Sequence, residues 1–130
     1  MIDHFGFAVS DLARSRTFYV KVFAPLGFAP VMDVTREQTG GYEGTGFGLP
    51  GRPEFWIGNG DRPSGPMHVA FEANSRAAVD AFYNAAIEAG GHDNGAPGLR
   101  PHYHEHYYGA FVLDPDGHNI EAVCHAPPTG

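Results

Sequence analysis

Cysteine, basic residues and long apolar runs are scarce in this 130-residue chain, and each scarcity excludes a class of protein. Cys124 is the only cysteine, so no disulfide can form within the chain. Eight Lys and Arg against fifteen Asp and Glu give a formal charge of -7 without a basic stripe, which disfavours binding to nucleic acid or to anionic membranes. No apolar run approaches the length of a membrane span, and no basic, apolar leader begins the chain. We therefore expect a soluble cytoplasmic protein that binds neither nucleic acid nor membranes.

Glycine, proline and aromatic residues are abundant, with 18 Gly, 11 Pro, 10 Phe and 6 Tyr. This composition is typical of one packed domain, here residues 1–130, built from short elements joined by many turns. Hydrophobic periodicity predicts a helix at 12–23 and a second between Ser75 and Gly90, each after capping residues. It predicts strands at 2–9, 28–34, 47–49, 54–57, 67–73, 107–113 and 119–125. Residues 35–46 and 93–101 are expected to be loops.

The two halves of the chain repeat one pattern. His4 is followed by Phe7, by Phe18-Tyr19 and by Gly27, and His68 is followed at the same offsets by Phe71, Phe82-Tyr83 and Gly91. Four features at identical spacing indicate an internal repeat of strand, helix and three strands. We predict an α+β fold of two βαβββ modules, residues 1–58 and 67–126, joined by a turn-rich linker at 59–66.

Glu121 is the feature that most needs an explanation, because it lies between Ile120 and Ala122 in an apolar strand. A carboxylate in such a place requires a partner charge, a metal ion or a water-filled cavity. The repeat puts His4 and His68 at equivalent places in two equivalent strands, where they can come together. Two neutral imidazoles and one carboxylate suit Zn, Fe(II), Ni or Mn and leave positions open for substrate.

A fourth corner of this site is expected on the strand at 54–57, which occupies the place in the first half that Glu121 occupies in the second. Glu54 is its only ionisable residue, and Trp56 lies on the same face of the strand. Either residue can fill the fourth corner. Farther along, the alternating run of His102, His104 and His106 follows Pro101, which favours a polar loop over a strand.

Several of these motifs together resemble the vicinal oxygen chelate superfamily, the group of glyoxalase I, bleomycin resistance proteins and extradiol dioxygenases. The resemblance rests on His4 with Ser10-Asp11-Leu12 and Phe18-Tyr19, on Leu26-Gly27-Phe28, on His68-Val69-Ala70-Phe71, and above all on the run from Asp114-Pro115-Asp116-Gly117 to Ile120-Glu121. It implies curled mixed sheets around a metal-containing cleft, with His4, His68 and Glu121 as ligands. It also implies a homodimer.

The resemblance implies a metal-dependent enzyme that binds a small substrate through adjacent oxygens. A glyoxalase-like lyase or isomerase, with Glu121 and Glu54 as catalytic carboxylates, is our first expectation. An Fe(II) extradiol-type dioxygenase and a drug-sequestering binding protein without enzymatic activity are the alternatives. Trp56, Tyr103, His104 and Tyr108 are the expected substrate contacts.

Overall fold

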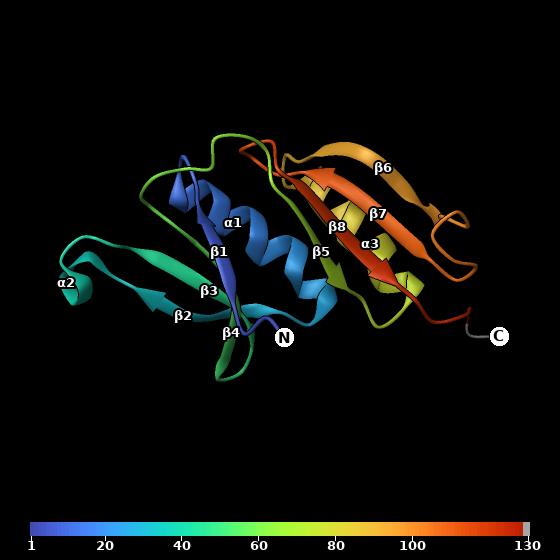
Figure 1. Cartoon of the computed structure of the whole chain (residues 1–130), viewed down its shortest axis with the longest axis horizontal. Coiled ribbons are helices and arrows are strands. Elements are labelled where there is room, and N and C mark those ends of the chain that lie inside the picture. The colour runs from blue at the N-terminus through green and yellow to red at the C-terminus, as the bar shows by residue number, and fades with distance from the viewer. Residues whose placement is uncertain (129–130) are drawn as a thin grey trace.

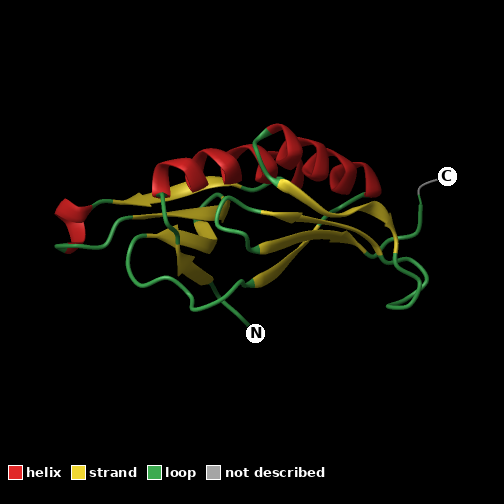
Figure 2. Ribbon diagram, turned by 90° about the horizontal axis from the view of Figure 1, so that it is seen from above, coloured by secondary structure: helices red, strands yellow, loops and turns green. Residues whose placement is uncertain are grey.

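The protein folds into two four-stranded sheets whose helices lie on one side, as seen in a computed structural model that describes residues 1–128 (Figure 1). The long helices α1 and α3 lie next to each other, and Figure 2 shows them covering one side of the sheets. The other side of each sheet, which we call the open face, carries no helix. Within the described residues, no helix is long and apolar enough to cross a membrane.

The first sheet has the order β1-β4-β3-β2, with β1 parallel to β4 and the other pairs antiparallel. Asp11 caps α1 by accepting from the backbone N–H of Arg14, and Gly27 ends the following 3-10 turn with a positive φ of 79°. The elements are β1 (Phe5–Ala8), α1 (Leu12–Phe23), η1 (Ala24–Leu26), β2 (Ala29–Val34), α2 (Arg36–Thr39), β3 (Gly44–Leu49) and β4 (Arg52–Gly58).

The second sheet has the same arrangement, with the order β5-β8-β7-β6 and β5 parallel to β8. Its helix is capped by the Ser75 side chain, which accepts from the N–H of Ala78. The elements are β5 (His68–Glu72), α3 (Arg76–Glu88), β6 (His92–Leu99), β7 (Tyr108–Leu113) and β8 (Asn119–Cys124). The predicted fold of two βαβββ modules is confirmed.

The core lies between the sheets and the two long helices. Phe23 of α1 packs edge-to-face against Phe47 and Phe55 of the first sheet and against Phe71 of the second, at ring distances of 4.8–5.6 Å. Such pairs bury large apolar areas and favour one packing arrangement. Phe23 of α1 therefore joins the two sheets into one core.

The turn before β8 ties the two halves together. Asp114 is buried, and its Oδ1 accepts from the backbone N–H groups of Asp116 and His118, while its Oδ2 accepts from the Tyr19 hydroxyl at 2.5 Å. Asp116 in turn accepts from the N–H and the hydroxyl of Ser10, just before α1. The turn that leads into Glu121 is thus held by residues of the first half.

Three expectations about the elements were wrong. Residues 92–99 form β6, although many of them are turn formers. β6 is an edge strand with two register shifts, so the missing N–H of Pro97 removes no hydrogen bond between strands. The expected loop at 35–46 contains the short helix α2, which has a capping box between Thr35 and Gln38. β3 begins at Gly44, three residues earlier than expected, and the sheets do not close.

Candidate functional site

Glu121 lies on the open face of β8, yet only 2% of its surface is exposed. Its side chain shares that face with Phe111, its partner on β7, while Ile120 and Ala122 point into the helix-side core. His68 of β5 places Nε2 3.0 Å from Glu121 Oε1. The structure therefore brings His68 and Glu121 together within a single chain, and their role as metal ligands stays a prediction.

Tyr107 covers the other oxygen of the same carboxylate. Its hydroxyl donates to Glu121 Oε2, and its ring lies over Gly109 of β7, where a Cβ would meet the ring edge at 3.2 Å. Burial, followed by the hydrogen bond to Glu121, raises the pKa of Tyr107 well above its ordinary value, so the hydroxyl stays protonated and donating. Sequence reasoning missed this residue. Strand alternation was the available signal, because Tyr107 has the parity of Gly109 and Phe111.

His4 does not join His68 and Glu121. It lies just before β1, is 62% exposed, and its Nδ1 is 2.8 Å from the neighbouring Asp3 carboxylate. Among residues 1–128, no three or more His, Cys, Asp or Glu side chains come close enough to hold a metal ion. The three expected ligands therefore do not assemble within one chain.

The strand registers decide which residue of the first sheet is the counterpart of Glu121. In the second sheet Ala70 pairs with Glu121 and Phe71 with Ala122. In the first sheet the equivalent pairs are Gly6 with Trp56 and Phe7 with Ile57. Trp56 therefore stands at the place of Glu121, one residue away from the position that the sequence offset of 64 predicts.

Trp56 lies flat on the open face because β3 has no side chain beneath it. A Cβ on Gly46 would be only 2.8 Å from two atoms of the indole ring. Tyr42 lies over Gly44 and Gly58 in the same way, and burial raises the pKa of its hydroxyl. Trp56 and Tyr42 line an apolar pocket of about 310 Å³ together with His4 and Val34.

Glu54 lies on the other side of Trp56, in a second pocket of about 360 Å³ that His4 also lines. Its carboxylate is 3.4 Å from the guanidinium of Arg52 and is part-exposed. Glu54 is thus close to His4 and is not the register counterpart of Glu121.

The expected substrate contacts from the C-terminal half occupy different places. His104 and Tyr103 lie in the loop between β6 and β7, where the Tyr103 ring contacts Tyr107 and His104 Nε2 is 2.7 Å from His125 Nδ1. Tyr108 points to the helix side, where its hydroxyl donates to Asp80 of α3. That hydrogen bond raises its pKa, and its role there is packing.

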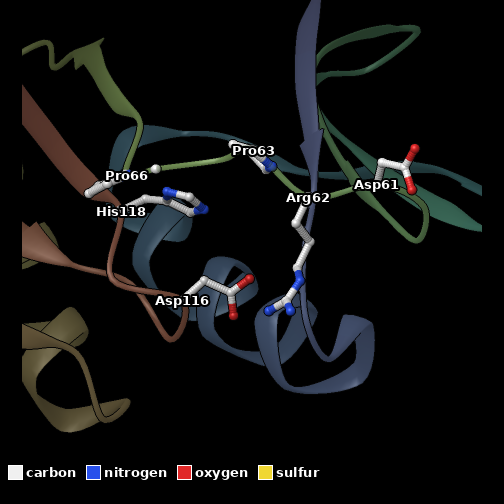
Figure 3. Close-up of a pocket in the computed structure, with 7 residues that line it drawn as sticks. Asp61, Arg62, Pro63, Pro66, Asp116 and His118 are labelled. Carbon is white, nitrogen blue, oxygen red and sulfur yellow. The ribbon is translucent and has the colours of Figure 1, made fainter.

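A third pocket, of about 670 Å³, is lined by none of the expected ligands. It lies between the linker and the turn before β8, where Figure 3 shows Arg62 and Asp116 at one end and His118 at the other. His118 is held in place, since its Nδ1 accepts from the N–H of Met67 at 2.9 Å and its ring contacts Phe7. These bonds are structural and belong to the junction between the halves.

Comparison with known proteins decides the family. The model of the glyoxalase/bleomycin resistance protein/dioxygenase superfamily matches residues 1–122. The chain belongs to this superfamily. None of the curated proteins matches it. Among solved structures, a glyoxalase/bleomycin resistance protein from Albidiferax ferrireducens T118 is 26% identical, with a TM-score of 0.76 over 94% of this chain and 97% of that one.

Two other members of the superfamily share the fold at lower identity. A family enzyme from Burkholderia phytofirmans PsJN is 21% identical, with a TM-score of 0.68 over 96% of this chain and 98% of that one. A glyoxalase I mutant from Zea mays is 23% identical, with a TM-score of 0.72 over 94% of this chain. The present chain spans only 45% of that protein's length.

Members of the superfamily typically bind a divalent metal ion, and His68 with Glu121 fits part of such a site. Metal bonds of about 2.1 Å to nitrogen and oxygen put two donor atoms about 3 Å apart where the bonds meet near a right angle, and about 3.4 Å apart in a tetrahedral zinc site. The 3.0 Å between His68 Nε2 and Glu121 Oε1 matches the first of these spacings. Two donors are one fewer than a catalytic site of this kind uses, so one chain supplies an incomplete set.

Proposed function

We propose that this superfamily member is a metal-dependent enzyme that acts on a small substrate bound through two adjacent oxygens. The observation that carries the proposal is the buried Glu121 with His68 at 3.0 Å on the open face. A carboxylate kept at 2% exposure, with no Lys or Arg nitrogen of residues 1–128 within 4.0 Å, is costly unless a cation or strong donors compensate its charge. Zn, Ni, Fe or Mn fit this donor set.

The missing third ligand comes, in our proposal, from His4 of a second copy of the chain. His4 is exposed and lies just before β1 of the first sheet, and it does not join His68 and Glu121. In a twofold homodimer the open face of one first sheet would meet the open face of the other copy's second sheet, and the two sites would be equivalent. The glyoxalase I from Zea mays, whose length would hold about two such chains, supports this pairing.

The bound metal would stabilise negative charge on the substrate oxygens. Glu54 is our candidate for moving the proton, because it lines a pocket with His4 and keeps its carboxylate part-exposed beside Arg52. Trp56 and Tyr42 offer an apolar surface on which the rest of the substrate can lie. Together these roles favour a glyoxalase-like isomerase or lyase.

One observation favours a second candidate, an Fe(II) dioxygenase of the extradiol type. Because Trp56 stands at the counterpart of Glu121, the proposed protein ligands would number three, namely His4, His68 and Glu121. Two histidines and one carboxylate form the facial triad of Fe(II) oxygenases. The two candidates differ in what they need from Glu54, which is the base in the first and is dispensable in the second.

Metal analysis of the wild type and of His68→Ala tests the proposal. We expect the wild type to retain a divalent metal and His68→Ala to lose it; equally low metal in both would contradict enzyme function of either kind. In that case, tight binding of an aromatic drug by metal-free protein would support the drug-sequestering alternative. Glu54→Gln then separates the enzymes. Loss of isomerase activity with metal retained supports the first, whereas oxygen uptake with a catechol, unchanged by Glu54→Gln, supports the second.

A further inference from the structure

The two oxygens of Glu121 face two different donors. Oε1 faces His68 Nε2 at 3.0 Å, and Oε2 accepts from the hydroxyl of Tyr107. A neutral imidazole nitrogen can present a lone pair to a cation. The Tyr107 hydroxyl donates to the other oxygen, so the carboxylate is held on one side by a hydrogen bond and faces His68 on the other.

Tyr107 is itself fixed before any ligand arrives. Its carbonyl accepts from the N–H of Arg100 at 2.7 Å, and its N–H donates to the carbonyl of His104 at 3.2 Å. Its ring lies 4.8 Å from the ring of Tyr103 and rests over Gly109. A hydroxyl held in this way can hold a carboxylate in one rotamer.

We propose that Tyr107 is the positioning residue of the metal ligand Glu121: it holds Oε2 so that Oε1 alone is presented beside His68 Nε2. The proposal rests on the metal-dependent function proposed above and assigns a role to a side chain outside the ligand set. Hydrogen-bond partners that orient a ligand typically contribute 10- to 100-fold to metal affinity. Without the hydroxyl, the Glu121 carboxylate would rotate, and Oε2 would be buried without a partner.

The test compares Tyr107→Phe with Tyr83→Phe in the whole chain. Both changes remove one phenolic oxygen, but Tyr83 lies on α3 and packs against the core on the helix side of the sheets. The zinc dissociation constant is measured by competition with a chromophoric chelator, and the melting temperature is measured without metal and with excess zinc. We expect Tyr107→Phe to bind zinc roughly 10- to 100-fold more weakly and to gain less stability from it, with zinc binding unchanged in Tyr83→Phe.

Each other outcome has one meaning. Wild-type affinity in Tyr107→Phe would overturn the positioning role while leaving the metal site intact, and tighter binding would mean that Tyr107 competes with the metal. Failure of the wild type to bind zinc, nickel, iron(II) or manganese would overturn the proposed function together with this role. If Tyr107→Phe does not fold, Gly109→Ala replaces it. Its new Cβ would lie 3.2 Å from the Tyr107 ring edge and 3.5 Å from Glu121 Oε2, so zinc binding should weaken as the Tyr107 hydroxyl is displaced from the carboxylate.

Discussion

Removal of one buried hydroxyl, in Tyr19→Phe, should destabilise the protein strongly. Tyr19 is fully buried, and its hydroxyl is 2.5 Å from Oδ2 of Asp114, which is 3% exposed. A hydrogen bond to a charged group contributes about 1.5–3 kcal/mol, and its loss leaves Oδ2 without this partner. For 130 residues the unfolding entropy is about 0.27 kcal/mol/K, so the melting temperature should fall by about 6–11 °C.

The hydrogen bond between Tyr19 and Asp114 should also make the stability of the protein depend on pH. Burial, and then the charge and hydrogen bond of Asp114, raise the pKa of Tyr19 in the folded protein. Stability from this group is complete below the unfolded pKa of about 10 and declines as the pH rises further, because only the unfolded state releases the proton. Thermal unfolding followed by circular dichroism between pH 7 and 11 measures both effects, with Tyr103→Phe as the exposed control. A melting temperature within about 2 °C of the wild type in Tyr19→Phe would refute the reasoning.

Three further predictions concern the first sheet. Gly46→Ala should displace the indole of Trp56, lower stability by about 1–3 kcal/mol and change the fluorescence of this single tryptophan; Gly41→Ala, with nothing within 4 Å of its Cβ, should do neither. Trp56→Glu puts a carboxylate at the counterpart of Glu121 and should tighten zinc binding in a chelator competition. Unchanged zinc affinity would contradict a fourth ligand position at residue 56. The hydrogen bond from Arg16 lowers the pKa of Asp33, so the stability that this pair contributes is present above about pH 4 and is lost as the pH falls. Because Asp33 is half-exposed, that stability should be less than about 1 kcal/mol. Acid denaturation of Asp33→Asn and the wild type measures it.

Most of the fold could be predicted from the sequence, because the helices and the central strands have strong local patterns. The helix at Leu12–Phe23 was predicted with its observed bounds, since Asp11 caps its start and Pro25 and Gly27 follow its end. β6 was missed because its residues, from His92 to Leu99, are those of turns. Its strand conformation comes from pairing with β7, a tertiary contact that local propensity does not contain.

The site was predictable in part. The pairing of His68 with Glu121 follows from the internal repeat and from the need to compensate a carboxylate in an apolar strand. Two features could not be predicted from the 64-residue offset between the two halves. Trp56 stands at the counterpart of Glu121 through a one-residue shift in strand register, and Tyr107 reaches Glu121 through its conformation at the end of a loop. The offset between two halves fixes neither.

Mixing two inactive variants tests most directly whether the site is shared between copies. His4→Ala and Glu121→Gln should each bind little zinc as purified homodimers. After unfolding and refolding of an equal mixture, a heterodimer would place both defects in one site and leave the other site intact. About half of the dimers would be mixed, so zinc binding should recover to about a quarter of the wild-type level. Zinc binding no higher than in either variant alone would contradict the shared site.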